Sequence, residues 1–265
     1  MNRIDRKFQE LRREGRKALI TFITAGDPDM ATTGQLVLAF DRSGADIVEL
    51  GVPFSDPMAD GPTIQASSFR ALKKGATLAK ILNLVKDIRR HSEIPIALMT
   101  YYNPVFRFGE EKFVREAVKA GVDGVIIPDL PPEEAVRLRI SARQEGLATV
   151  FFLAPTTTPQ RMKTIIQQAT GFIYYVSLTG VTGARQRLPA SLFAGVQQAK
   201  RLTRKPVCVG FGIASPDQVR EIARFADGVI VGSAIVKAIE KNAGNRDLVA
   251  SVSHFVSRLA RPLRT

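Results

Sequence analysis

The sequence predicts an α/β fold, a (β/α)₈ TIM barrel with an extra N-terminal helix and extra helices after strand eight. Eight short apolar runs alternate with longer amphipathic patterns, which is typical of a parallel sheet with helical crossovers. The length of 265 residues suits one such barrel. The alternative is a doubly wound open sheet, but the first turn, Thr24-Ala25-Gly26-Asp27-Pro28, lacks the G-x-G-x-x-G pattern of dinucleotide-binding sheets.

The expected strands are short and almost free of charge, as parallel strands buried on both faces are. They cover residues 18–24, 46–50, 95–101, 124–128, 148–153, 172–176, 207–210 and 228–231. The second strand is unusual, because Asp46-Ile47-Val48-Glu49-Leu50 carries a carboxylate, Glu49, inside an apolar run. Such a carboxylate is costly unless it is paired, solvated at a cavity or used chemically.

The expected helices have apolar residues at helical spacing. Between strands they cover residues 31–43, 62–74, 78–91, 110–120, 133–145, 159–169, 189–202 and 216–225; a charged helix over 2–14 precedes strand one, and helices over 233–241 and 247–259 follow strand eight. Ser215-Pro216-Asp217-Gln218 is a capping-box pattern, and Thr158-Pro159 and Leu188-Pro189 mark two other helix starts. No linker is visible, so we expect one barrel domain over residues 1–265.

The composition excludes several classes of protein. The formal net charge is +13, but the basic residues fall mostly in amphipathic helix patterns and Trp is absent, which favours solvated helix faces over a nucleic-acid surface. The single cysteine, Cys208, precludes an intramolecular disulfide and fits a reducing cytoplasm. The first residues are too charged for a secretory signal, and no apolar run reaches transmembrane length. We therefore expect no membrane or nucleic-acid partner.

Two carboxylates lie where a barrel collects its function, at and after the carboxyl end of strand two. By the period of two, Ile47, Glu49 and Gly51 share a face, so Glu49 is expected to point into the barrel mouth. Burial there should raise its pKa and suit it to proton transfer. A loop fixed by Pro and Gly then brings Asp60 back near Glu49. The residues alone leave two alternatives open: a Glu49 satisfied by a neighbouring loop, and an Asp60 that only caps a helix or turn.

Glycine-rich turns after strands seven and eight predict a phosphate site. They are Val209-Gly210-Phe211-Gly212-Ile213 and Val231-Gly232-Ser233-Ala234. In such barrels these loops and a helix N-terminus commonly bind phosphate through backbone N–H groups. Ser233 can add a hydroxyl and cap the next helix, while ordinary tight turns are the alternative. The small, polar loop over residues 177–185 predicts a lid, with Gly183 offering an N–H to the phosphate, or else a passive surface loop.

What the strand ends lack narrows the chemistry further. No expected strand carries Lys at its carboxyl end, which argues against a Schiff-base aldolase. His91 and His254 lie in helical patterns and are expected at the surface, so a zinc site is not supported. Cys208 is expected to be a small core residue, and no Ser/His/Asp set is available. These residues predict metal-free proton chemistry by carboxylates on a phosphorylated small molecule.

Residues 49–65, from Glu49-Leu50-Gly51-Val52-Pro53 to Pro62-Thr63-Ile64-Gln65, resemble the signature of the tryptophan synthase alpha chain family. The resemblance extends over the chain to about Asn242. The other matching motifs are Phe22-Ile23-Thr24-Ala25-Gly26-Asp27-Pro28, Tyr101-Tyr102-Asn103-Pro104, Pro128-Asp129-Leu130-Pro131, Gly180-Val181-Thr182-Gly183-Ala184 and Gly210-Phe211-Gly212-Ile213.

The resemblance implies a lyase that cleaves indole-3-glycerol phosphate to indole and D-glyceraldehyde 3-phosphate in tryptophan biosynthesis. Glu49 would be the acid/base and Asp60 the acceptor of the indole N–H; a fixed anion there would stabilise the cationic ring formed when carbon 3 is protonated. Tyr174 matches the family's active-site tyrosine. The implied substrate-binding residues are Phe22, Met99, Tyr101 and Ile126 around the indole, Gly183, Phe211, Gly212, Gly232 and Ser233 at the phosphate, and also Thr182.

The resemblance also implies a partner. The family works as an αββα heterotetramer in which the beta chain holds pyridoxal phosphate, so no cofactor or metal is expected in this chain. The loops over residues 53–60, 103–106 and 177–185 would face the beta chain. Two other functions stay open at this point: another phosphate-binding barrel, such as a phosphosugar epimerase, and a non-catalytic subunit that only activates a partner.

Overall fold

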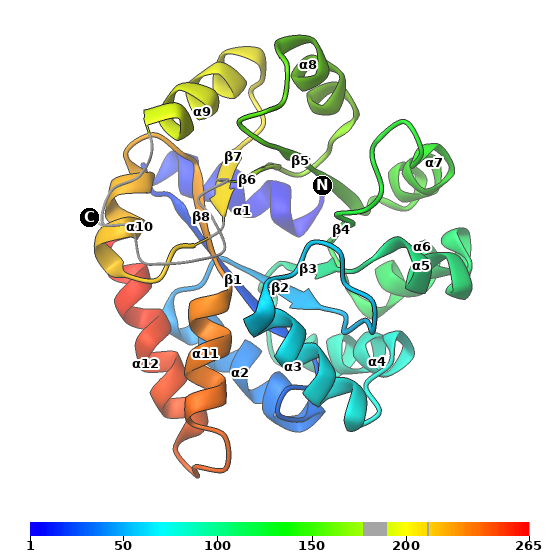
Figure 1. Ribbon diagram of the computed structural model, residues 1–265, viewed down its shortest axis with the longest axis vertical. Coiled ribbons are helices and arrows are strands. Elements are labelled where there is room, and N and C mark those ends of the chain that lie inside the picture. Colours follow the sequence, from blue (N-terminus) through cyan, green and yellow to red (C-terminus); the bar gives the residue numbers. More distant parts are fainter. Residues whose placement is uncertain (177–189, 211, 265) are drawn as a thin grey trace.

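The computed structural model describes residues 1–176, 190–210 and 212–264. Within them, eight parallel strands form a closed barrel in chain order, β1 to β8, surrounded by helices (Figure 1). The strands are β1 Ala18–Thr24, β2 Ile47–Gly51, β3 Ile96–Met99, β4 Gly124–Ile126, β5 Ala148–Leu153, β6 Ile173–Val176, β7 Val207–Gly210 and β8 Gly228–Val231. The expected barrel is therefore confirmed.

Apart from one additional helix after β3, the helices before, between and after the strands follow the expected order. They are α1 Arg3–Arg13, α2 Met30–Ser43, α3 Pro62–Lys73, α4 Leu78–Ile88, α5 Tyr102–Phe108, α6 Glu110–Ala120, α7 Val136–Glu145, α8 Pro159–Gln168, α9 Ala190–Leu202, α10 Pro216–Ala223, α11 Ser233–Lys241, α12 Leu248–Ala260 and a 3₁₀ turn, η1, Arg261–Leu263. The capping box at Ser215 and the cap at Thr158 are confirmed. The helix start expected at Leu188-Pro189 lies outside the described residues.

The largest correction concerns the chain after β3. We expected a strand over residues 95–101 and a loop over 103–106, but β3 ends at Met99 and α5 occupies Tyr102–Phe108. The Tyr102 N–H donates to both carboxylate oxygens of Asp129, at 2.9 and 3.2 Å, and this contact turns the chain out of the sheet. Helix α7 also begins three residues later than expected, because Glu134 and Ala135 first form a turn on the Pro131 carbonyl.

Alternating side chains divide the strands into an inner and an outer core. Helix α1 closes the amino end of the barrel by packing Ile4, Phe8 and Leu11, at helical spacing, against the inner set. The ring centroids of Phe8 and Phe172 lie 5.9 Å apart. Cys208 belongs to this inner core and is fully buried, as expected. The amino end is thus filled by side chains, and only the carboxyl end can receive a substrate.

The amino ends of the strands are joined in pairs by one repeated contact. A polar residue just before each even-numbered strand accepts, through its side chain, the N–H of the first or second residue of the preceding odd-numbered strand, and its own N–H bonds back to that residue's carbonyl. The side-chain contacts are Leu19 N to Asp46 Oδ2 (2.8 Å), Ile96 N to Asp123 Oδ2 (2.8 Å), Thr149 N to Thr170 Oγ1 (2.7 Å) and Val207 N to Asp227 Oδ2 (3.0 Å). The same pair of hydrogen bonds therefore fixes the register of four pairs of neighbouring strands.

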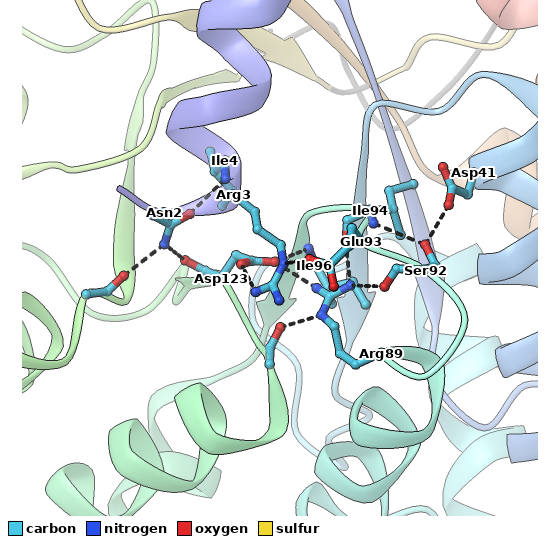
Figure 2. Close-up of polar contacts among 12 residues, drawn as sticks. Asn2, Arg3, Ile4, Asp41, Arg89, Ser92, Glu93, Ile94, Ile96 and Asp123 are labelled. Carbon is cyan, nitrogen blue, oxygen red and sulfur yellow. Dashed lines mark hydrogen bonds and ion pairs between the residues drawn. The ribbon is translucent and has the colours of Figure 1, made fainter.

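Asp123 is the centre of the most extensive of these contacts (Figure 2). Its carboxylate also accepts from Arg3 at 3.1 Å and from Arg89 at 2.8 Å, and its carbonyl accepts from Asn2. Only 3% of the Asp123 side chain and 10% of the Arg89 side chain are exposed. Arg89 was expected on a solvated helix face; instead it ties α4 to β3 and α1 through a buried ion pair.

Replacing Asp123 by Ala is expected to lower the free energy of unfolding by about 3–5 kcal/mol, because Arg89 is left charged, buried and unpaired. Chemical denaturation at pH 7 measures the change. The matched control is Asp217→Ala, since Asp217 pairs with Arg220 at 2.5 Å while 88% of its side chain is exposed, and such a pair contributes little. Equal effects of the two substitutions would contradict the assignment of Asp123 as a structural centre.

A second stability prediction concerns Tyr175 on β6. The side chain is fully buried beside α9, and its hydroxyl has no hydrogen-bond partner among the described residues. The close approach requires Gly195, because a Cβ there would lie 1.9 Å from the hydroxyl. Tyr175→Phe removes an unsatisfied polar group, so we expect the free energy of unfolding to stay the same or to rise by about 1 kcal/mol. A fall of that size in a denaturation curve would contradict this prediction.

Candidate active site

Glu49 lies in the barrel interior, one side-chain layer below the carboxyl end of β2. It pairs in register with Phe22 of β1 and Ala97 of β3, and it is completely buried. Neither carboxylate oxygen has a hydrogen-bond partner among the described residues, which argues against a Glu49 satisfied by a neighbouring loop. Burial raises the pKa of Glu49 to about 8. The side chain therefore holds a proton near neutral pH and can release it to a substrate.

Two further groups mark where the Glu49 carboxyl points. The pKa of Tyr174 on β6 is raised first by burial and then by the charge of Glu49. The pKa of Cys208 on β7 is raised first by burial, then by the charge of Asp227 and then by that of Glu49. Both strands lie across the barrel from β2. Asp60 contributes to the raised pKa of Tyr174 as well. Glu49, Tyr174 and Asp60 thus share one electrostatic environment although they come from different elements.

Asp60 lies in the loop between β2 and α3, beside a cleft at the carboxyl end of the barrel. The cleft is lined by Phe22, Thr24, Gly51, Val52, Asp60, Ile64, Ser68, Met99, Thr100, Tyr101 and Pro128. Burial raises the pKa of Asp60, and a side-chain hydrogen bond from Tyr101 acts in the opposite direction. The N-cap position of α3 is Gly61, which has no side-chain cap. The residues do not show the capping contact that was the alternative function of Asp60.

Two glycines at the carboxyl ends of strands make room for aromatic rings, and one of them, Gly51, lines the cleft. A Cβ on Gly51 would lie 2.6 Å from the Phe22 ring, and one on Gly210 would lie 2.5 Å from the Tyr174 hydroxyl. Phe152, in register with Tyr174, places its ring 4.7 Å from the Tyr174 ring. Sequence reasoning missed Phe152 and gave Gly51 and Gly210 no such role. The period of two along β5, continued from Val150, was the signal that could have found Phe152.

Helix α3, which follows the loop that carries Asp60, is held by side-chain contacts to neighbouring elements. Thr24 of β1 and Ser67 of α3 are joined through their hydroxyl oxygens at 2.6 Å. Arg70 of α3 donates twice to the buried Asp27 carboxylate, both at 2.8 Å, and once to Glu240 of α11 at 2.7 Å. Figure 1 shows α3 and α11 side by side. The middle and the last turn of α3 are therefore fixed against β1, the turn after it and α11.

The phosphate prediction rests on the start of α11. Gly232 is at the N-cap position and Ser233 is the first helical residue, so the expectation that Ser233 caps this helix is wrong. The first turn of α11 carries no acidic residue. Gly232 lies against Phe22, since a Cβ on it would be 3.4 Å from the Phe22 side chain. The exposed N–H groups of this helix start thus adjoin the same aromatic wall as Asp60.

Some of the other predicted site residues lie within the described part of the chain and some lie outside it. Ile126 is fully buried in the inner core and does not line the cleft, while Gly212 is exposed with a left-handed φ of 75°. Thr182, Gly183, Phe211 and the lid over residues 177–185 lie outside the described residues. His91 and His254 are exposed, as expected. In the described part of the chain, no group of three or more His, Cys, Asp or Glu side chains could hold a metal ion.

Comparison with known proteins gives a consistent result. The family described as "Tryptophan synthase alpha chain" matches residues 8–263. A tryptophan synthase alpha chain of Geotalea daltonii is 53% identical over 259 residues, which cover 98% of each chain. The solved tryptophan synthase subunit alpha from Legionella pneumophila is 39% identical, with a TM-score of 0.92 over 99% of this chain and 98% of that one.

A tryptophan synthase complex from Pyrococcus furiosus contains a chain that is 43% identical, with a TM-score of 0.84 over 92% of this chain and 98% of that one. The matches cover the barrel, the α1 closure and the helices after β8 alike. Identity above 30% over nearly the full length of both chains is enough to assign a family. The chain belongs to the tryptophan synthase alpha chain family.

Proposed function

We propose that Glu49 and Asp60 carry the reaction of a tryptophan synthase alpha chain, the retro-aldol cleavage of indole-3-glycerol phosphate to indole and D-glyceraldehyde 3-phosphate. The observation that carries this proposal is Glu49 itself, a completely buried carboxyl group without a hydrogen-bond partner among the described residues and with a pKa of about 8. A group of this kind is costly to the fold, which is typical of residues kept for chemistry.

The proposed reaction needs only one proton carrier. Protonated Glu49 gives its proton to indole carbon 3, and the ring becomes a cation. The Glu49 carboxylate then takes the proton of the adjacent glycerol hydroxyl. The bond between the ring and the glycerol carbon breaks, its electron pair neutralises the ring, and an aldehyde forms. Glu49 ends protonated, as it began, so the cycle closes without another acid or base.

Asp60 has the complementary function in this proposal. Its carboxylate accepts the indole N–H and offsets the positive charge that develops on the ring. Phe22, Met99 and Tyr101 line the cleft beside Asp60 and supply apolar walls for indole. The start of α11 and Gly212 bind the phosphate. The phosphate-binding residues that the family resemblance implies outside the described part of the chain bind it as well. Burial raises the pKa of Tyr174, and the charges of Glu49 and Asp60 raise it further.

The partner belongs to the same proposal. One solved relative is a tryptophan synthase complex, which supports a beta-chain partner for this chain. Met58 in the loop over residues 53–60 and Phe106 in α5 are large apolar side chains that are 84% and 63% exposed, and they support an interface at this end of the barrel.

A tryptophan synthase alpha chain needs no cofactor of its own, and pyridoxal phosphate is proposed for the beta chain. No helix in the described ranges is long and apolar enough to cross a membrane. A cytoplasmic location is proposed from the single cysteine.

The test is an assay of the purified chain, alone and with a beta chain, for release of indole from indole-3-glycerol phosphate. We expect release in both cases. Epimerisation of a phosphosugar without indole release would favour the other barrel enzyme. Stimulation of the beta chain without any turnover by the alpha chain would favour a non-catalytic subunit.

A further inference from the structure

The hydroxyl of Tyr101 lies at the junction between the β3 end and the loop that carries Asp60. It accepts the Ala59 N–H at 2.9 Å, and Ala59 is the residue directly before Asp60. The Tyr101 ring also contacts Phe54 at the start of the same loop, with 5.4 Å between ring centroids. One side chain, at the N-cap position of α5 just after β3, therefore holds both ends of the loop.

The direction of the Ala59 contact determines what the hydroxyl offers to Asp60. A phenol has one proton, and because the Ala59 amide donates to its oxygen, that proton is free to point elsewhere. Burial raises the pKa of Tyr101 to about 12, so the proton stays on the oxygen throughout the neutral range. Asp60 directly follows Ala59 and lines the same cleft as Tyr101, and the interaction between the two side chains lowers the pKa of Asp60 against the effect of burial.

We propose that Tyr101 is a positioning residue whose hydroxyl accepts the Ala59 N–H, donates to the Asp60 carboxylate, and thereby fixes where Asp60 meets the indole nitrogen. This inference rests on the proposed function, and it gives Tyr101 a polar task beyond that of an apolar wall. A fixed and ionised Asp60 is what the developing cation requires, because reorienting the carboxylate during the reaction would cost part of the stabilisation.

The test compares Tyr101→Phe with Tyr102→Phe. Both remove one phenolic oxygen, and the neighbouring Tyr102 hydroxyl contacts only Glu110 of α6, at 3.3 Å, among the contacts described. The first readout is the titration of the Asp60 carboxyl by ¹³C NMR, with the signal assigned from Asp60→Asn. We expect Tyr101→Phe to raise the pKa of Asp60 and Tyr102→Phe to leave it unchanged, whether or not the chain is active. An unchanged titration in Tyr101→Phe would overturn the inference.

The second readout is indole release across pH, measured with the beta chain present. Tyr101→Phe is expected to lower kcat/KM roughly ten- to hundredfold and to move its acid limb to higher pH, because Asp60 ionises less readily. The double variant with Asp60→Asn and Tyr101→Phe should lower kcat/KM no more than Asp60→Asn alone, because both substitutions remove the same interaction. Additive losses would assign Tyr101 to packing and overturn the inference. A wild-type chain that releases no indole would overturn the proposed function, while the NMR titration still decides the contact.

Discussion

Glu49→Gln is expected to lower kcat for indole release by about 10²–10⁴-fold while substrate still binds. The substitution keeps the shape of the side chain and removes the titrating proton, and no second group within the described residues is both buried and raised to a pKa near 8. Steady-state kinetics with a separate measurement of substrate affinity distinguishes the two effects. The fall should appear in kcat, because proton transfer matters in the transition state and not in the bound ground state.

The control for this experiment is Glu10→Gln, since Glu10 is an exposed residue of α1 that pairs with Lys7 at 3.0 Å, far from the barrel mouth. Glu10→Gln should leave kcat unchanged. Turnover retained in Glu49→Gln would remove Glu49 from the proton-carrier function, and a loss of affinity equal to the loss of activity would assign it to binding.

The second large effect is on the pH dependence of the free energy of unfolding. The pKa of Glu49 is 4.5 for the ordinary group and about 8 in the folded chain. Between these values the folded protein keeps a proton that the unfolded chain has released, so raising the pH favours unfolding. The contribution of Glu49 is fully present below about pH 4.5, declines as pH rises to 8, and levels off above that. Its total size is on the order of 5 kcal/mol.

Glu49→Gln should abolish this pH dependence, because the amide does not titrate. We therefore expect the variant to match the wild type near pH 5 and to exceed its free energy of unfolding by several kcal/mol at pH 8.5. Denaturation of both proteins at the two pH values measures the difference, and other titrating groups cancel in the comparison. A constant difference between the two proteins across this range would show that Glu49 does not carry a raised pKa.

Much of the fold followed from the sequence because its signals are local. Short apolar runs between amphipathic helix patterns predicted the strands, and the bounds of β1, β5, β7 and β8 were predicted to the residue. Helix α5 could not be predicted, because the contact that starts it joins Tyr102 to Asp129 across 27 positions of the chain. Arg89 was misplaced for the same reason, since its partner Asp123 lies on a different strand connection.

The candidate site could be predicted from the sequence to a similar extent. The period of two placed Glu49 inside the barrel, and a carboxylate in a buried strand implied a raised pKa. The bare residues could not separate an Asp60 that caps α3 from one that faces a cleft, because both occupy a turn before a helix. That distinction depends on Tyr101, which lies at the N-cap position of α5, after a different strand. The room that Gly51 makes for Phe22 is likewise a contact between strands, which no local pattern encodes.

The central claim is that Glu49 moves the proton while Asp60 holds the indole nitrogen. The most direct measurement is a crystal structure of Glu49→Gln with uncleaved indole-3-glycerol phosphate bound. We expect the indole nitrogen within hydrogen-bonding distance of the Asp60 carboxylate, carbon 3 facing residue 49, and the phosphate between Gly212 and Ser233. An indole nitrogen directed away from Asp60, or a phosphate bound elsewhere than at the start of α11, would contradict the central claim.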